Sequence, residues 1–115
     1  MPGSANGVVV SGSHAYVVDS ECCLDVIDIS TPSSPQRVGS VRTPGYPYGV
    51  AVSGSRAYVA DYSGLQVIDI SNPASPKLLG GVVTTGTASG VAVAGSYVWV
   101  AAGSHGLVAF RAQCK

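Results

Sequence analysis

The chain repeats itself at a fixed interval of about 42 residues. Residues 7–19 read GVVVSGSHAYVVD, and residues 49–61 read GVAVSGSRAYVAD, 42 positions later. A third copy, GVAVAGSYVWVAA, occupies residues 90–102, a further 41 positions along the chain. A second block, LDVIDIS at residues 24–30, returns as LQVIDIS at residues 65–71. A period of this length indicates a fold that uses one supersecondary structure several times.

Each copy divides into four short β-rich runs separated by turn residues. In the second copy we expect strands at Gly49–Ser53, Arg56–Asp61, Leu65–Ile70 and Lys77–Thr84. The Ser-Gly-Ser between the first two runs suits a tight hairpin. Residues 71–76 carry two prolines, which cannot donate to a strand ladder, so a wider turn is expected there. The density of Val, Ile, Gly and Pro excludes helix almost everywhere.

The runs are nearly continuous in apolar residues, as in LQVIDI, instead of alternating strictly with polar ones. This pattern predicts small sheets that are covered on both faces. Four antiparallel strands per repeat, with neighbouring sheets on both sides, are typical of a β-propeller. Small residues in the first strand of each copy suit crowding around a central axis. A two-sheet sandwich is the alternative, but it needs no internal period.

The predicted fold is all-β, with about three four-stranded antiparallel propeller blades, the last of which lacks its fourth strand. We expect a flexible leader or cloning remnant at residues 1–6, then blades at residues 7–48, 49–89 and 90–115. Propellers close with about 4 to 8 blades, so a single chain forms an incomplete ring. Residues 1–6 are a candidate strand for the open edge of the last blade, although Pro2 and Gly3 make it a poor one.

Blades at the two ends of an open ring expose apolar faces that neighbours normally cover, and such patches drive association. We therefore expect the chain to close a ring by self-association, with two chains and six blades favoured. The rival interpretation is a piece excised from a longer propeller.

Charge and hydropathy narrow the range of partners. The six basic and six acidic residues cancel, so the formal charge is zero and there is no electrostatic footprint for nucleic acid or an anionic membrane. No apolar run approaches the roughly 20 residues of a membrane-spanning helix, and residues 1–7 lack the features of a signal peptide. We expect no nucleic-acid partner and no membrane span.

Loops on one side of the blades are the expected binding surface, because loops on a rigid scaffold commonly carry binding. Hairpins after the second strands and returns after the fourth strands emerge on the same side. Tyrosines there offer amphipathic contact area and aspartates offer hydrogen-bond acceptors, so we expect a protein, peptide or glycan ligand. The candidate residues are Asp19, Tyr46, Tyr48, Asp61, Tyr62 and His105. The two aspartates also start hairpins, where a turn role comes first.

Other conspicuous residues have structural interpretations. Tyr16, Tyr58 and Trp99 hold one repeat position inside the second strand, which predicts core packing. Asp28 and Asp69 precede Ser-Thr-Pro and Ser-Asn-Pro, where a carboxylate caps the amides of a turn.

The three cysteines do not define a disulfide framework, because their number is odd. Cys22 and Cys23 are neighbours, which prevents an ordinary loop-closing disulfide between them, so we predict a free pair, with Cys114 a terminal thiol. Cys22, Cys23 and His105 fall in equivalent hairpins, a combination that suits zinc. A fourth ligand and the usual paired spacing are missing, so we expect no metal and no cofactor.

Catalytic motifs are missing from the sequence. It contains no Gly-x-Ser-x-Gly elbow and no phosphate-binding Gly-Lys loop, and both histidines stand in turns without a sequence partner. We therefore predict a non-enzymatic binding or assembly module. One alternative is part of a propeller enzyme with a site at the central channel, since catalytic groups can meet in space from several blades. The other is an engineered or excised fragment without a native function of its own. A channel lined only by Gly, Ala, Val and Ser would favour the module.

The second copy also resembles a known family. Residues 49–76 follow Gly-Val-x-Val-x-Gly-x-x-Ala-Tyr-Val-Ala-Asp and then Gly-Leu-x-Val-Ile-Asp-Ile-Ser-x-Pro-x-x-Pro, a pattern similar to the LVIVD repeat. The first copy differs mainly at Cys22 and Cys23, and the third departs at Ala102 and at residues 110–111. The resemblance implies a propeller and, because the family occurs in bacterial and archaeal extracellular or surface proteins, a location outside the cell. It implies no catalytic residues.

Overall fold

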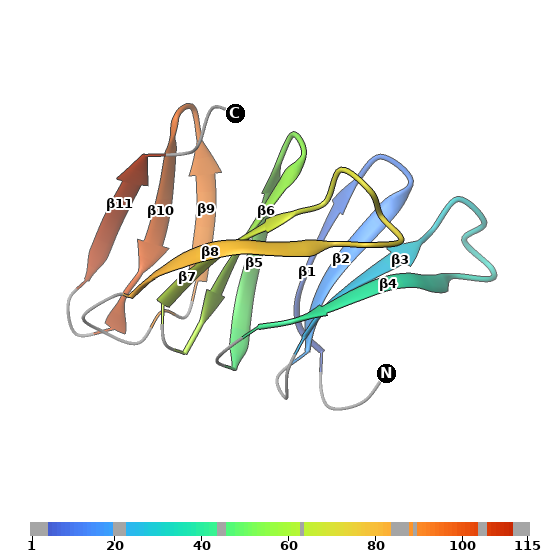
Figure 1. Ribbon diagram of the computed structural model, residues 1–115, viewed down its shortest axis with the longest axis horizontal. Helices are drawn as coiled ribbons and strands as arrows, with labels where there is room; N and C mark the ends of the chain where they lie inside the picture. Colours follow the sequence, from blue (N-terminus) through green and yellow to red (C-terminus); the bar gives the residue numbers. More distant parts are fainter. Residues whose placement is uncertain are drawn as a thin grey trace.

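In a computed structural model of the chain, every regular element among the described residues is a β-strand (Figure 1). The strands form three separate antiparallel sheets in a body of 41 × 30 × 20 Å. This arrangement confirms the predicted all-β fold of propeller blades. The structure describes residues 5–19, 23–43, 46–62, 64–83, 88, 90–103 and 106–111.

Each sheet is a simple meander whose strands follow the order of the chain. Blade 1 contains β1 (Ala5–Ser11), β2 (His14–Asp19), β3 (Cys23–Asp28) and β4 (Gln36–Arg42). Blade 2 contains β5 (Pro47–Ser53), β6 (Arg56–Asp61), β7 (Gly64–Asp69) and β8 (Lys77–Val83). Blade 3 contains β9 (Gly90–Ala94), β10 (Tyr97–Ala101) and β11 (Leu107–Arg111). As predicted, β11 has only β10 as a neighbour in its sheet among the described strands.

The observed strands start earlier than predicted at two places. β1 begins at Ala5, inside the segment that was expected to be a leader, because Ala5 pairs with Asp19 across the first hairpin. The Asn6 side-chain amide adds a hydrogen bond of 3.3 Å to the carbonyl oxygen of Pro47. β5 likewise begins at Pro47, two residues before the predicted start. The remaining strands of blade 2 agree with the prediction to within one residue.

The Ser-Gly-Ser turns are tight hairpins, as predicted. In blade 1 the turn joins the pair Ser11 and His14, so the loop itself has two residues. Gly12 has a φ of 62°, and no described residue other than glycine has a positive φ. Positive φ at the first loop position alone is the signature of a type II′ turn, which favours glycine there. Gly54 and Gly95 repeat the same conformation, with φ of 60° and 61°.

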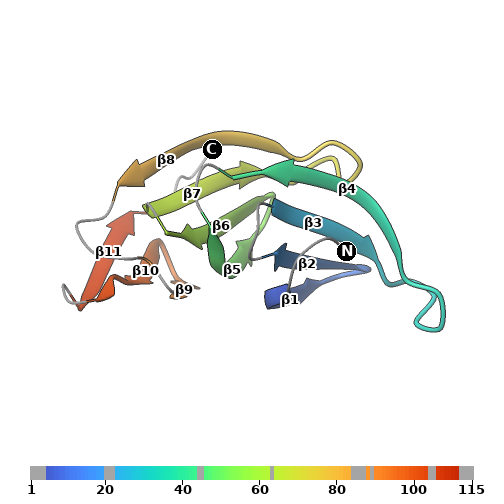
Figure 2. The ribbon, with the colours of Figure 1, turned by 90° about the horizontal axis from the view of Figure 1, so that it is seen from below.

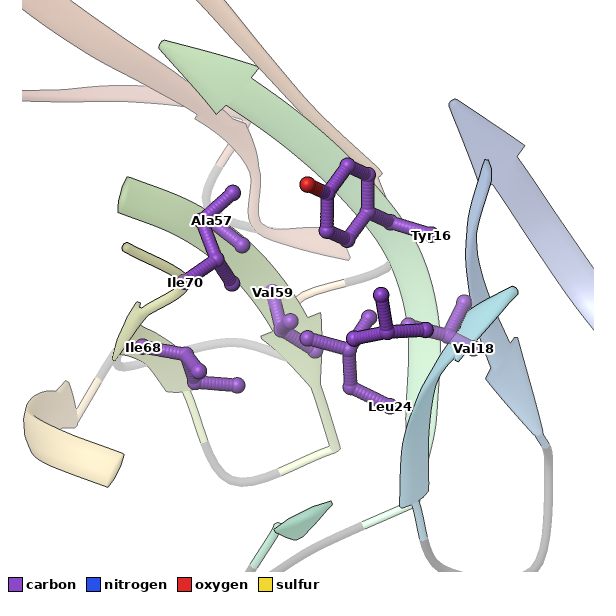
Figure 3. Packing of buried hydrophobic residues seen from close by; sticks show 8 residues of the cluster. Tyr16, Val18, Leu24, Ala57, Val59, Ile68 and Ile70 are labelled. Atoms are coloured by element: carbon purple, nitrogen blue, oxygen red, sulfur yellow. The ribbon is translucent and has the colours of Figure 1, made fainter. Parts of the chain in front are cut away.

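The blades stack face to face, and the core lies between them. One apolar cluster joins blade 1 to blade 2 (Figure 3) and contains Tyr16, Val18, Leu24, Val26, Ala57, Val59, Ile68 and Ile70. A second cluster joins blade 2 to blade 3 and contains Tyr58, Ala60, Leu65, Ala88, Val98 and Val100. Blade 2 is thus buried on both faces, which explains its nearly continuous apolar strands.

The stack fans out from its inner strands (Figure 2). β1, β5 and β9 lie side by side at the narrow side of the fan, whereas β4 and β8 lie on the wide side. The backbones approach closely at the narrow side: a Cβ atom on Gly7 would lie 3.2 Å from the Tyr48 carbonyl oxygen and 3.6 Å from the Gly49 Cα. Small residues in the first strand of each repeat permit this approach. The described residues include no helix that is long and apolar enough to span a membrane.

Candidate functional site

Three of the predicted ligand-face residues form one exposed aromatic cluster. Tyr46 lies in the connection between β4 and β5, Tyr48 is the second residue of β5, and Tyr62 follows β6. The rings of Tyr48 and Tyr62 lie 6.4 Å apart with an interplanar angle of 52°. The backbone N–H of Tyr62 donates to the carbonyl oxygen of Tyr46 at 3.0 Å, which ties the two loops together. We call these three residues, all exposed, the tyrosine cluster.

The two aspartates of the predicted ligand face point inward. Asp19 and Asp61 are both fully buried at the ends of β2 and β6. The Asp61 carboxylate accepts hydrogen bonds from the backbone N–H of Gly64 at 3.0 Å and from the side-chain amide of Gln66 at 3.5 Å. These contacts hold the hairpin between β6 and β7, which is the turn role expected first. His105 lies outside the described residues.

One charged pair was not predicted from the sequence. Asp25 in β3 is almost completely buried, and its carboxylate lies 3.5 Å from the guanidinium of Arg37, which is half exposed in β4. Blade 2 has Gln66 and Leu78 at the equivalent positions. Aligning the repeats could have revealed this pair, because the neutral residues Gln66 and Leu78 of blade 2 are both replaced by charged residues in blade 1. A buried carboxylate needs such a partner, so the two positions are coupled.

Asp28 and Asp69 cap turns, as predicted. The Asp28 carboxylate accepts the backbone N–H of Ser30 at 2.8 Å and its hydroxyl at 2.7 Å. Asp69 accepts the backbone N–H of Ser71 at 2.9 Å. Because these bonds stabilise the charged form, chiefly through the backbone donor, the pKa of each carboxyl is lowered from its ordinary value of 3.8. Both groups serve the wide turns between the third and fourth strands.

The predicted free pair of cysteines is wrong for Cys23, which is disulfide-bonded. Cys22 and Cys114 lie outside the described residues. A sulfur in a disulfide is not a thiolate, so Cys23 cannot serve the zinc site considered from the sequence. The described part of the chain holds no group of three side chains that could bind a metal ion.

The most open apolar surfaces lie at the two ends of the stack. At one end Trp99 is 38% exposed, although the equivalent Tyr16 and Tyr58 are 5% and 2% exposed. The prediction that Trp99 belongs to the core is therefore wrong, because no blade among the described residues covers it. Leu107 is 66% exposed, against 0% and 2% for its equivalents Leu24 and Leu65. We call this end the trailing face; it consists of Tyr97, Trp99, Ala101, Leu107 and Ala109.

Blade 1 presents the opposite end. Val8 and Val10 in β1 are exposed, whereas the equivalent Val50 and Val52 of β5 are partly buried and pack on the cluster between blades 1 and 2. We call Val8 and Val10 the leading face. In both contacts between blades, the residues equivalent to the trailing face pack against the residues equivalent to the leading face of the next blade. The two open ends therefore carry the two kinds of surface that meet between blades inside the chain.

A family model for the LVIVD repeat matches residues 2–43, 44–84 and 85–109, which together are nearly the whole chain. The chain belongs to the LVIVD repeat family. Its three matched segments coincide with the three blades, so the resemblance inferred from residues 49–76 is confirmed. The repeat is that of a β-propeller family, in agreement with the stacked sheets.

Solved structures show the same arrangement of strands. A crystal structure of the computationally designed Ika8 protein matches 94% of this chain with a TM-score of 0.78 at 13% identity. A functionally unknown protein from Desulfotomaculum acetoxidans DSM 771 matches 87% with a TM-score of 0.77 at 21% identity. The chain spans about a third of the length of each, 33% and 35%.

The designed Ika4 protein matches over 98% of this chain and 94% of its own, with a TM-score of 0.57 at 12% identity. No curated protein matches the chain. At these identities the structural matches show the fold alone.

Proposed function

We propose that this chain is a non-enzymatic assembly and binding module. Its trailing face packs against the leading face of a second copy, so that two chains close a ring of six blades. The ring then presents its loops to a protein or glycan ligand, with the tyrosine cluster as the contact surface.

The exposure of Trp99 is the observation that carries this proposal. The same repeat position is buried in both blades that have a following neighbour, and it is open only in blade 3. Tyr97 stands beside it, with ring centroids 6.2 Å apart, so the open surface is a broad aromatic face. Burial of large aromatic side chains is among the strongest contributions to an interface. An exposed face of this kind marks an interaction site.

The partner is inferred from the chain itself. Both internal interfaces bring a trailing surface onto a leading surface, and the stack leaves one of each open. A head-to-tail contact between two copies uses the same pair of complementary surfaces that already meet between the blades of one chain. Such contacts form a closed ring when the accumulated rotation returns to the start, and a ring of six blades lies within the usual range.

Ligand binding is assigned to the tyrosine cluster because its three side chains are exposed, the rings of Tyr48 and Tyr62 lie close together, and a backbone hydrogen bond joins Tyr62 to Tyr46. Tyrosine supplies a large amphipathic contact area at a small cost in side-chain entropy, and recognition loops use it for that reason. Stacking on a sugar ring or packing against a peptide would use the same surface.

Two further observations support a non-enzymatic module and a location outside the cell. The described inner strands read ANGVVVS, PYGVAVS and GVAVA, and so offer no acid, base or thiol at the narrow side of the fan. This composition favours a module over an enzyme with a site in the central channel. The disulfide at Cys23 fits an oxidising compartment, in line with the extracellular or surface location proposed from the family resemblance.

The molar mass in solution tests the assembly. Light scattering after gel filtration should give twice the mass of one chain, and Trp99→Glu or Val10→Glu should give monomers because each places a charge in the interface. Tyr62→Glu is the matched control, since it adds the same charge to an exposed ring away from both faces. An equimolar mixture of the two monomeric variants should associate again, because each retains one intact face. A well-folded wild-type monomer at tens of micromolar would refute the proposal.

A further inference from the structure

The tyrosine cluster is not a requirement of the repeat. Tyr46, Tyr48 and Tyr62 occupy positions that the other two repeats fill with small or polar residues. In blade 1 these residues are Ser4, Asn6 and Ser20, and in blade 3 they are Thr87, Ser89 and Gly103. Blades 1 and 3 thus form their sheets without an aromatic ring at any of the three positions. The packing of blades therefore does not explain the rings of blade 2.

The exposure of the cluster does not depend on the two ends of the stack. Blade 2 packs against a neighbouring blade on both faces. Tyr46 and Tyr62 are nevertheless 58% and 55% exposed, and Tyr48 is 39% exposed. Since a blade is already present on either side, the three rings stay open for a ligand that is not another blade.

Ring faces alone supply the apolar surface of the cluster. The leading face is aliphatic, and the trailing face combines its rings with Leu107. At residues 46–48 and at position 62, by contrast, the exposed large apolar side chains are all tyrosines. The rings of Tyr48 and Tyr62 are inclined at 52°, so they do not stack face to face and their faces remain available. Each ring also carries a phenol hydroxyl that can donate and accept a hydrogen bond.

An amide from the neighbouring blade stands beside the rings. β1 and β5 lie side by side, and the Asn6 side-chain N–H donates to the carbonyl oxygen of Pro47 at 3.3 Å. Pro47 lies between Tyr46 and Tyr48 in the chain, so this bond holds the amide next to the cluster. Asn6 is exposed, and its amide oxygen can accept a hydrogen bond from a ligand hydroxyl.

The described residues place no formal charge within the cluster. The two carboxylates at this side of the blades, Asp19 and Asp61, are fully buried. Arg42 is exposed, but it lies in β4, which runs along the wide side of the fan, whereas Tyr48 lies in the inner strand β5 (Figure 2). Recognition at the cluster therefore relies on ring faces and hydrogen bonds instead of ion pairs.

We propose that the tyrosine cluster and Asn6 bind a neutral oligosaccharide. A sugar ring is apolar on its faces, where C–H bonds point outward, and polar around its edge, where hydroxyl groups project. Its faces would stack on the tyrosine rings, whose faces carry partial negative charge, while its hydroxyls would bond to the phenol groups and to Asn6. This ligand class deepens the binding role proposed above and rests on it, but it does not require the two-copy ring.

Isothermal titration calorimetry with defined sugars tests the ligand class. The probes are short neutral oligosaccharides of the cellulose, chitin and mannan types, and at least one of them should bind saturably. Tyr48→Ala and Tyr62→Ala should each weaken that binding about tenfold, because each removes one stacking ring. Leu79→Ala is the control and should leave binding unchanged, since Leu79 is 50% exposed in β8 and lies outside the cluster.

Substitutions at Tyr62 separate ring stacking from general apolar contact. Tyr62→Phe keeps the ring and should bind within about threefold of the wild type. Tyr62→Leu keeps apolar bulk without a ring, so it should lose as much affinity as Tyr62→Ala. Both variants should keep the melting temperature of the wild type, because the side chain is exposed. Asn6→Ala should also weaken binding, because it removes the amide oxygen that accepts a sugar hydroxyl.

The carbohydrate site is overturned if none of the three oligosaccharides binds saturably at millimolar concentration. Undiminished affinity in Tyr62→Leu would also overturn it, because that result indicates apolar packing of the kind that a protein ligand makes. Sugar binding by a chain that stays monomeric would support the carbohydrate site and reject the two-copy ring. Dimers that bind none of the sugars would reject the carbohydrate site and leave the two-copy ring standing.

Discussion

Truncation of one leucine position in two blades gives a quantitative test of the stacked-blade arrangement. Leu65 and Leu107 occupy the same repeat position, but Leu65 is 2% exposed between blades 2 and 3 whereas Leu107 is 66% exposed on the trailing face. A change to alanine removes three carbon atoms in either case. Each buried carbon atom is worth about 0.8 kcal/mol, so Leu65→Ala loses about 2.4 kcal/mol of burial. The cavity left behind raises the loss in unfolding free energy to about 3–4 kcal/mol.

Leu107→Ala should be much milder. About a third of the side chain is buried and solvent fills the space, so the expected loss is about 0.8 kcal/mol. Urea unfolding followed by circular dichroism measures both values, at protein concentrations low enough to populate the single chain. With a slope of about 1.5 kcal/mol per molar urea, the Leu65→Ala midpoint should fall by about 2 M and the Leu107→Ala midpoint by about 0.5 M. Equal shifts, or a Leu65→Ala loss below about 1 kcal/mol, would refute the burial of that position by a neighbouring blade.

Three further variants test local features. Arg37→Leu should destabilise the fold by about 1–2 kcal/mol, because it leaves the Asp25 carboxylate buried without its cation. Adding Asp25→Gln recreates the neutral pair of blade 2 and should restore most of the lost stability. A double-mutant cycle of urea unfolding measures this coupling. Gly54→Ala should cost about 1 kcal/mol from backbone strain alone, since φ there is 60° and no atom crowds the position, and an unchanged melting temperature would contradict the type II′ turn. Asp69→Asn should be less stable than the wild type above pH 4, and the two stabilities should converge as the pH falls. The lowered pKa of Asp69 means that its charged form stabilises the fold above the ordinary pKa of 3.8, and this stability is lost as the pH falls through the folded-state pKa. A difference in urea midpoint that persists at pH 2 would argue against the cap.

The sequence predicts the architecture well because each repeat forms a sheet with two apolar faces, and such a sheet must pack between neighbouring sheets. A strand such as β7, apolar on both sides, is satisfied only between two other sheets, and the structure places it there. The tight Ser-Gly-Ser hairpins and the caps at Asp28 and Asp69 were predicted from local chemistry, which depends on residues close in the chain.

The errors arise where the environment of a residue depends on distant parts of the chain. Trp99 has the repeat position of Tyr16 and Tyr58, and only the neighbouring blade decides whether that position is buried. Asp19 begins a hairpin like many surface aspartates, yet its side chain is fully enclosed.

The candidate site was predicted in part. The three tyrosines do gather, because the start of β5 and the residue before it lie beside the end of β6. The open space beside Gly80 in β8 has no signature in its own residues, since Gly39, in the same register of β4, is also a glycine. Pro73 and Pro76 of the turn before β8 lie against Gly39, whereas no described atom lies within 4 Å of a Cβ placed on Gly80. Only the three-dimensional packing shows this difference.

The fluorescence of Trp99 tests the assembly most directly, because it is the single tryptophan of the chain and lies on the trailing face. Emission spectra should be recorded from nanomolar to tens of micromolar protein. Our account predicts a shift to shorter wavelength as the concentration rises, with a midpoint that matches the rise in molar mass and a loss of the shift in Val10→Glu, whose leading face is blocked. A solvent-exposed emission maximum that does not change across that range would contradict it.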